Sequence, residues 1–116
     1  MLAKLTSAAV HGVEAIEVAI EVHATLGLKK TVIVGLPDTA VKEAGERVQA
    51  ALRNSGFRFP EGHSTVNLAP ADLRKEGPSF DLPIALGMIA CTEESGQSWS
   101  LGDCVVVGEL ALEGTV

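Results

Sequence analysis

Ser79 is the residue whose type and position come closest to catalytic chemistry. It stands in the stretch KEGPSFDLPIAL, residues 75–86, after Gly-Pro and before an apolar run. A serine at the start of a helix can act as a nucleophile when a base lies within hydrogen-bond distance of its hydroxyl. Other proteins place a helix cap there, which is purely structural. The sequence therefore leaves two interpretations of Ser79, one chemical and one architectural.

Pro83 bears on this choice, because proline fits the first turn of a helix but lacks the N–H that the next turn needs. With Asp81 as the cap, Pro83 falls at the second helical position, where it costs nothing. With Ser79 as the cap, Pro83 stands where the first intrahelical hydrogen bond should form. We therefore expect Asp81 to cap the helix. Lys75 precedes the turn on a polar loop, where we expect a solvated, charged ammonium that cannot take a proton at neutral pH.

Other groups show no spacing typical of a site. The segment GLPD, residues 35–38, has one glycine and no lysine, so we expect a tight turn and not a phosphate loop. The histidines lack the short spacing of metal ligands, and no Cys-x-x-Cys accompanies them. They are His11, His23 and His63. We therefore expect no catalytic, cofactor or metal site in this chain.

The composition is that of a folded globular protein. Of 116 residues, 47% are hydrophobic and only 3% aromatic, so Val, Ile, Leu and Ala must build the core. The net charge of −6 opposes DNA binding by this domain alone, because that affinity comes mostly from Lys and Arg. No apolar run reaches the roughly 20 residues of a membrane span. Cys91 and Cys104 have no motif spacing, and we expect reduced, buried thiols in a cytoplasmic protein.

The elements that position these residues follow from hydrophobic periodicity. Strands are predicted at 3–10, 14–22 and 31–34, and the second alternates between apolar and polar residues. Short connections between the three favour an antiparallel meander.

After residue 35 the period becomes that of an amphipathic helix, capped by Asp38 or Thr39 and ending at 54–56. A strand at 64–68 and an apolar helix at about 79–92 follow. The closing segment CVVVGELAL predicts a final strand or pair of strands.

The resulting order, β-β-β-α-β-α-β, predicts an α/β (α+β) two-layer sandwich with both helices on one face of the sheet. We expect a single domain, 1–116. Its last residues, ELALEGTV, stop after a turn signal in a strand-like context. We therefore expect the N-terminal fragment of a longer protein.

Three blocks of the sequence resemble the N-terminal domain of the ComM/YifB family, the magnesium chelatase-like AAA+ ATPases often labelled magnesium chelatase subunit I (ChlI-like). The blocks are TVIVGLPDTAVKEAGERVQAALRNSGFRFP, VNLAPADLRKEGPSFDLPIALGMIA and VVVGELALEG. They occur in this order over essentially the whole chain. The resemblance implies a ribosomal protein S5 domain 2-like fold, shared with the Lon proteolytic domain, with a left-handed crossover.

The resemblance also implies a function. It points to a non-catalytic domain that serves assembly or substrate coupling in a hexameric, DNA-processing motor. ATP and magnesium are implied for a downstream AAA+ module beyond Val116, and no cofactor is expected in this fragment. The implied partners are that module and other copies of the chain, with DNA as a partner of the parent protein. No membrane is expected.

The segment KEGPS is similar to the Lon segment that carries the catalytic serine, and Ser79 falls on that position. Lon-type peptidases take their lysine base from a later segment, which lies past the end of this chain. We interpret Ser79 as a vestigial nucleophile position, and a Lon-like serine peptidase domain using Ser79 is the alternative. The resemblance implies a family-motif surface made of Gly35, Pro37, Asp38, Asn67, Asp72, Lys75, Gly77, Pro78, Ser79 and Asp81.

Overall fold

The computed structural model describes residues 2–71, 73, 75, 78–92 and 103–116. In these residues four strands form one sheet. The strands are β1 (Leu2–His11), β2 (Glu14–Thr25), β3 (Lys30–Val34) and β4 (His63–Ala69). The helices are α1 (Asp38–Asn54), the 3-10 turn η1 (Pro78–Phe80) and α2 (Asp81–Thr92). The four strands and both α-helices were predicted, to within a few residues at their ends, whereas η1 was expected to be part of the second helix.

The order of the strands differs from the expected meander. The sheet runs β1-β2-β4-β3, with β4 antiparallel to β2 and parallel to β3. The meander was wrong because β3 leads into a helix, and a strand–helix–strand unit returns its second strand parallel to its first. The more completely buried strand, β4, takes the central position: Val66 and Leu68 are fully buried, whereas Ile33 is the buried residue of β3. The left hand of the β3–α1–β4 crossover stays a prediction.

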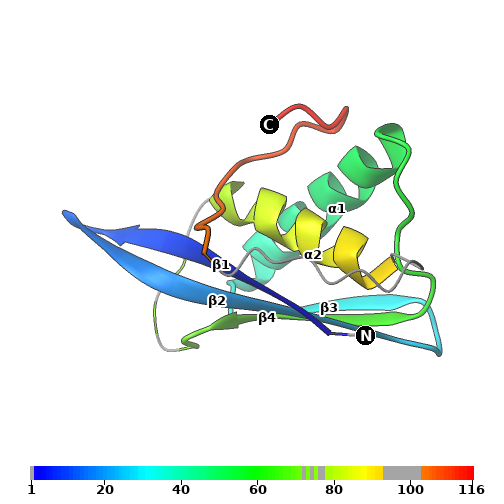
Figure 1. Ribbon diagram of the computed structural model, residues 1–116, viewed down its shortest axis with the longest axis horizontal. Helices are drawn as coiled ribbons and strands as arrows, with labels where there is room; N and C mark the ends of the chain where they lie inside the picture. The colour runs from blue at the N-terminus through cyan, green and yellow to red at the C-terminus, as the bar shows by residue number, and fades with distance from the viewer. Residues whose placement is uncertain (1, 72, 74, 76–77, 93–102) are drawn as a thin grey trace.

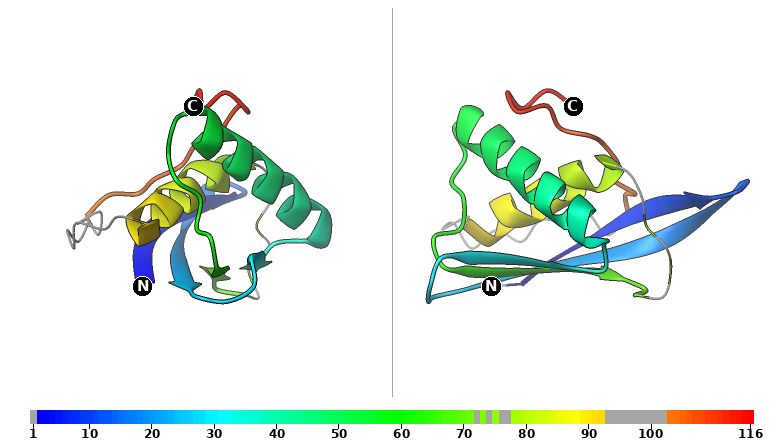
Figure 2. Two further views of the ribbon diagram at one scale, coloured as in Figure 1. Left: turned by 90° about the vertical axis from the view of Figure 1, so that its right-hand side faces the viewer. Right: turned by 180° about the vertical axis from the view of Figure 1, so that it is seen from behind.

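Both helices cover the same face of the sheet, which confirms the two-layer sandwich (Figures 1 and 2). The core lies between the layers. It is built from one face of each strand and from the inner sides of α1 and α2. The alternation expected in β2 is confirmed, because Val18, Ile20 and Val22 are fully buried. The β1–β2 hairpin projects beyond the rest of the sheet, at the left of Figure 1.

The helix ends follow the expected stop but not the expected cap. Helix α1 ends at Asn54, and Gly56 has a φ of 81°, which favours glycine. At its start Pro37 occupies the cap position, and no side chain caps the helix. The expectation that Asp38 or Thr39 caps α1 was therefore wrong. Proline fits this position because its fixed φ, here −59°, suits the approach to a helix.

The expected final strand is reduced to a single bridge in residues 103–116. Val105 pairs with Thr6 of β1 in parallel, and the Val106 N–H donates to the Thr6 carbonyl at 2.9 Å. The segment then leaves β1. The Gly108 N–H donates to the Ser79 carbonyl at 2.8 Å, and the Gly108 carbonyl accepts from the Leu82 N–H at 3.0 Å. These bonds divert the segment away from the sheet and onto the start of α2.

Candidate functional site

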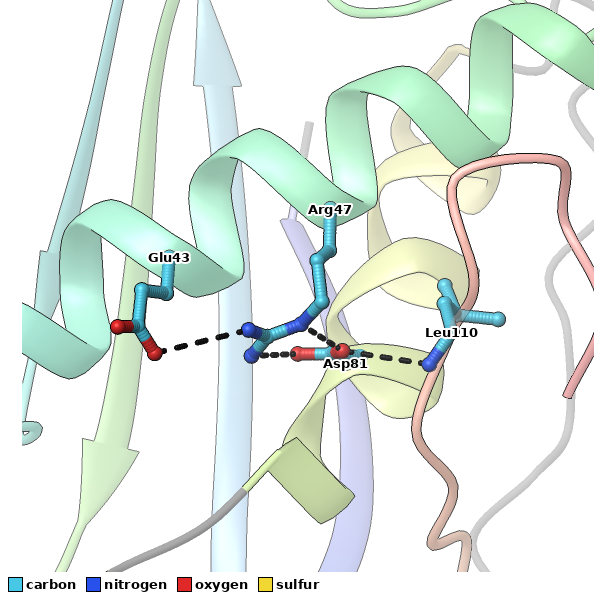
Figure 3. A network of polar contacts seen from close by, with 4 residues as sticks. All are labelled: Glu43, Arg47, Asp81 and Leu110. Carbon is cyan, nitrogen blue, oxygen red and sulfur yellow. Dashed lines mark hydrogen bonds and ion pairs between the residues drawn. The ribbon is translucent and has the colours of Figure 1, made fainter.

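The start of α2 holds a buried ion pair that links two helices (Figure 3). Asp81 is the first residue of α2 and Arg47 lies in α1. The Arg47 Nε donates to Asp81 Oδ2 at 2.6 Å, and Nη2 donates to Oδ1 at 3.0 Å. This is the two-pronged geometry that a guanidinium makes with a carboxylate, the strongest form of such a pair. The Asp81 side chain is 1% exposed and that of Arg47 is 23% exposed.

The C-terminal segment joins the same carboxylate. The Leu110 N–H donates to Asp81 Oδ2 at 3.2 Å, while Glu43 lies 3.8 Å from Arg47 Nη1. The hydrogen bond to Asp81, with help from the charges around it, raises the pKa of Arg47 above its ordinary value, although burial opposes the shift. Both Asp81 oxygens are thus occupied by donors from α1 and from residues 103–116. Asp81 holds three parts of the fold together, and its carboxylate is not available as a general base.

The expectation that Asp81 caps α2 was wrong. Within the described residues its carboxylate accepts from Arg47 and Leu110, not from the amides of its own helix. The physical reason is burial: a carboxylate at 0% exposure needs a counter-charge, and a cap bond supplies none. Arg47 was not among the predicted site residues. Its partner lies 34 residues away, and no local feature of the sequence indicates the pairing.

Ser79 lies in η1, on the other side of this turn. Its residue is partly buried, and it lines a groove of about 580 Å³ together with residues 8–12 of β1 and its turn, Val105 and Val107. His11 is among the lining residues. The structure gives no hydrogen bond from the Ser79 hydroxyl to any described side chain. A serine without a base in contact is a poor nucleophile, so the geometry favours the architectural interpretation.

Lys75 is where the sequence prediction failed most clearly. It was expected to be solvated, but only 1% of its surface is exposed. Its Nζ donates to the Pro70 carbonyl and, at 2.9 Å, to the Leu73 carbonyl. Main-chain carbonyls replace part of the water that a buried ammonium loses. These bonds fasten the loop between β4 and η1 to itself.

The other described residues of the expected motif surface lie at several places in the fold, and the surface itself stays a prediction. Gly35 has a φ of 103°, and a Cβ there would lie 2.3 Å from the Leu68 carbonyl oxygen, so it lets β3 leave the sheet beside β4. Pro37 and Asp38 are exposed at the start of α1. Asn67 lies between two buried residues of β4, so it faces away from the helices.

Pro78 opens η1 and is partly buried. Asp72 and Gly77 lie outside the described residues. Ser79 and Asp81 therefore lie on one turn but face different sides of it. Asp81 points into the core, and Ser79 lines the groove.

In the described part of the chain, no three His, Cys, Asp or Glu side chains come together in a way that could hold a metal ion. No helix there is long and apolar enough to cross a membrane. Cys91 and Cys104 are free thiols, as expected, but Cys104 is exposed and not buried.

Comparison with known proteins identifies the family. Residues 20–116 match the family described as "Subunit ChlI of Mg-chelatase". The chain belongs to this family. The match includes β4, both helices and the Arg47–Asp81 pair, and it begins within β2.

Individual members of the ChlI family match over nearly the whole chain. Protein YifB of Salmonella typhimurium is 49% identical over 115 residues, which are 99% of this chain and 22% of that protein. Competence protein ComM of Haemophilus influenzae is 50% identical over 113 residues, which are 97% of this chain and 22% of that protein. Protein Rv2897c of Mycobacterium tuberculosis is 36% identical over 116 residues, 99% of this chain and 23% of its own length. The chain thus spans about a fifth of the length of these relatives.

These matches bear on the two interpretations of Ser79. The resemblance to the ComM/YifB group of the ChlI family is confirmed. The alternative of a Lon-like serine peptidase is not supported, either by the matched proteins or by the surroundings of the Ser79 hydroxyl.

Proposed function

We propose that this chain is the non-catalytic N-terminal domain of a ComM/YifB-like AAA+ ATPase, a cytoplasmic hexameric motor that processes DNA. The domain serves assembly of the ring or coupling of the motor to its substrate. Identity of 49–50% to YifB and ComM over almost the whole chain supports a shared role for this part of the molecule. ATP and magnesium belong to another module of the parent protein in this proposal.

The observation that carries the proposal is how the Asp81 carboxylate is used. It ties α1, the start of α2 and the segment around Leu110 into one unit. The same segment is fixed further by Gly108 and by the Asn54 side chain, whose Nδ2 donates to the Leu112 carbonyl at 2.7 Å. A domain whose C-terminal segment is held at several points is suited to transmit force or position to a module that follows it.

The experiment uses the full-length protein that contains this chain. Three forms are compared: the intact protein, a form lacking residues 1–116, and Ser79→Ala. Hexamer formation is measured by analytical ultracentrifugation with ATP, and ATP hydrolysis is measured with and without DNA. We expect the truncated form to bind ATP but to lose hexamers or to lose DNA-stimulated hydrolysis at least about tenfold. Ser79→Ala should retain both properties within about twofold.

Two results speak against the proposal. A truncated form that assembles normally and keeps its DNA-stimulated hydrolysis shows that the domain serves neither role. Loss of activity in Ser79→Ala, with assembly intact, shows that the serine does chemistry. Asp38→Ala, which changes an exposed acid on α1, is the matched control for a surface substitution.

A further inference from the structure

Among the residues that the structure describes, the outer edge of β1 is only partly paired. β1 is the edge strand of the sheet, and its Thr6 carbonyl accepts from Val106, so the peptide groups of Thr6 face outward. Main-chain groups alternate in direction along a strand, so those of Ala8 and Val10 also face outward, while residues 7 and 9 face β2. Within the described residues, the segment that pairs with Thr6 has turned away before it reaches Ala8 and Val10.

These outward peptide groups open into the groove beside Ser79. One wall is formed by residues 8–12, and the other by Val105 and Val107. The apolar side chains along it are exposed: Val10 by 79%, Val105 by 61% and Val107 by 50%. Unpaired peptide groups next to exposed β-branched side chains are what an added strand requires.

We propose that this groove binds an extended polypeptide segment, which pairs with Ala8 and Val10 as an added strand of the sheet. The docked segment pairs with β1 directly after Thr6, which is already bridged to Val105. It therefore extends an existing strand pairing along the same edge. At about 3.3 Å per residue, the free part of β1 from Ala8 to His11 accommodates about four residues of partner.

The walls define the chemistry of the partner. Valine and alanine side chains favour apolar or β-branched residues in the docked segment. Exposed acids adjoin the lining residues in the chain: Glu14 pairs with His11, and Asp103 and Glu109 each stand two residues from a lining valine. These acids favour lysine or arginine at the ends of the segment, and they repel a nucleic acid backbone. This inference goes beyond the proposed function and does not depend on it.

The test is an NMR titration of the 15N-labelled 116-residue chain. The probe is the capped peptide acetyl-KVTVTVK-amide, and the control probe is N-methylated at every valine, threonine and lysine, so that neither edge of its backbone can donate a hydrogen bond to β1. We expect shift changes concentrated at the amides of Ala8, Val10, Val105 and Val107. We also expect slower hydrogen exchange at Ala8 and Val10, and no response to the N-methylated peptide.

Three variants locate the site. Val10→Pro removes an outward N–H without removing a bond to β2, and Val107→Asp places a charge in the apolar wall. Each should weaken binding at least about tenfold. Val13→Ser, which changes a fully exposed valine of the hairpin turn outside the groove lining, should leave the affinity unchanged. If circular dichroism shows that the proline of Val10→Pro disturbs β1 itself, the binding measured with Val107→Asp alone decides whether the groove is the site.

Several outcomes overturn the proposal. The KVTVTVK peptide fails to bind, or it binds with shifts elsewhere. The N-methylated peptide binds equally well, which excludes strand pairing. The free chain shows the Ala8 and Val10 shifts on self-association alone, which makes a second copy the occupant of the edge.

Discussion

Ser79 and Asp81 lie two residues apart on one turn, yet they occupy opposite environments. Asp81 is fully buried, and its carboxylate accepts three hydrogen bonds from Arg47 and Leu110. Ser79 lines a groove, and its carbonyl accepts from Gly108 while its hydroxyl makes no hydrogen bond to a described residue. The Asp81 network is architecture, and the Ser79 groove is surface.

The contrast shows how this fold uses two residue types that are common in catalytic sites. A carboxylate and a serine near a helix start are typical of acid–base or nucleophilic sites. Here the carboxylate is consumed by packing two helices and the C-terminal segment. The serine lines a groove, and within the described residues its hydroxyl makes no hydrogen bond to a side chain that could take its proton.

Arg47→Met should destabilise the fold most, because it leaves the fully buried Asp81 without its counter-charge. Breaking a buried pair in this way costs about 3–5 kcal/mol of unfolding free energy. Urea denaturation followed by circular dichroism measures the change. Arg53→Met is the matched control, since Arg53 is exposed on the same helix and should stay within about 0.5 kcal/mol of the wild type. Equal effects of the two substitutions would contradict the account.

Asp81→Ala should cost about 3 kcal/mol, near the lower end of the range for a broken buried pair. The remaining Arg47 is partly exposed and keeps Glu43 within 3.8 Å, so its charge is less costly than that of an unpaired Asp81. A lost helix cap costs only about 0.5–2 kcal/mol, so the size of the loss in unfolding free energy distinguishes an ion-pair partner from a helix cap. Combining Asp81→Ala with Arg47→Met should cost less than the sum of both. Simple additivity would show that the two side chains do not interact in solution.

Ser79→Ala should change the unfolding free energy by less than about 0.5 kcal/mol, because only the Ser79 main chain takes part in a bond within the described residues. Thermal unfolding of the variant beside the wild type is the measurement. A loss of unfolding free energy above about 2 kcal/mol would show that the Ser79 hydroxyl has a structural partner, as the Asp81 carboxylate has, and would contradict the contrast between the two residues.

Cys104 should react with iodoacetamide before Cys91. Burial raises the pKa of the Cys91 thiol, and its Sγ donates to the Val22 carbonyl at 3.3 Å, whereas Cys104 is exposed. The pKa of Cys91 is raised in the folded state only, so the folded state favours the protonated thiol. Its contribution to the unfolding free energy is therefore fully present below the pKa of the unfolded thiol, about 8.5, and is lost as the pH rises through the folded-state pKa. Peptide mass spectrometry after short alkylation at pH 8 checks the order. Faster labelling of Cys91 contradicts the burial.

The strands and helices were predictable because their hydrophobic periodicity repeats over neighbouring residues. Alternation in β2 and the 3.6-residue period of α1 each involve about a dozen neighbouring residues, so their positions followed from the sequence. The position of β4 between β2 and β3 did not follow, since strand order depends on which strand buries more surface. Val66 and Leu68 look no different in sequence from the apolar residues of an edge strand.

The side chains of the site were less predictable than the elements. Asp81 was predicted to be a helix cap, whereas its carboxylate pairs with Arg47, which stands 34 residues away and carries no local signal. Lys75 was placed in solvent because its neighbours are polar, yet it is buried against its own loop. A polar residue in a loop is expected to be solvated, and the carbonyls of Pro70 and Leu73, which accept from Lys75 in the structure, could not be foreseen from its polar neighbours.

The most direct test of the central claim is covalent labelling of Ser79. The 116-residue chain is incubated with a serine-directed fluorophosphonate and digested, and the peptide that contains Ser79 is analysed by mass spectrometry. The Ser79→Ala variant is the control. The account predicts no adduct on Ser79, because no described side chain forms a hydrogen bond with its hydroxyl to activate it. A stoichiometric adduct on Ser79, absent from the variant, would show an activated nucleophile in the groove and contradict the architectural role.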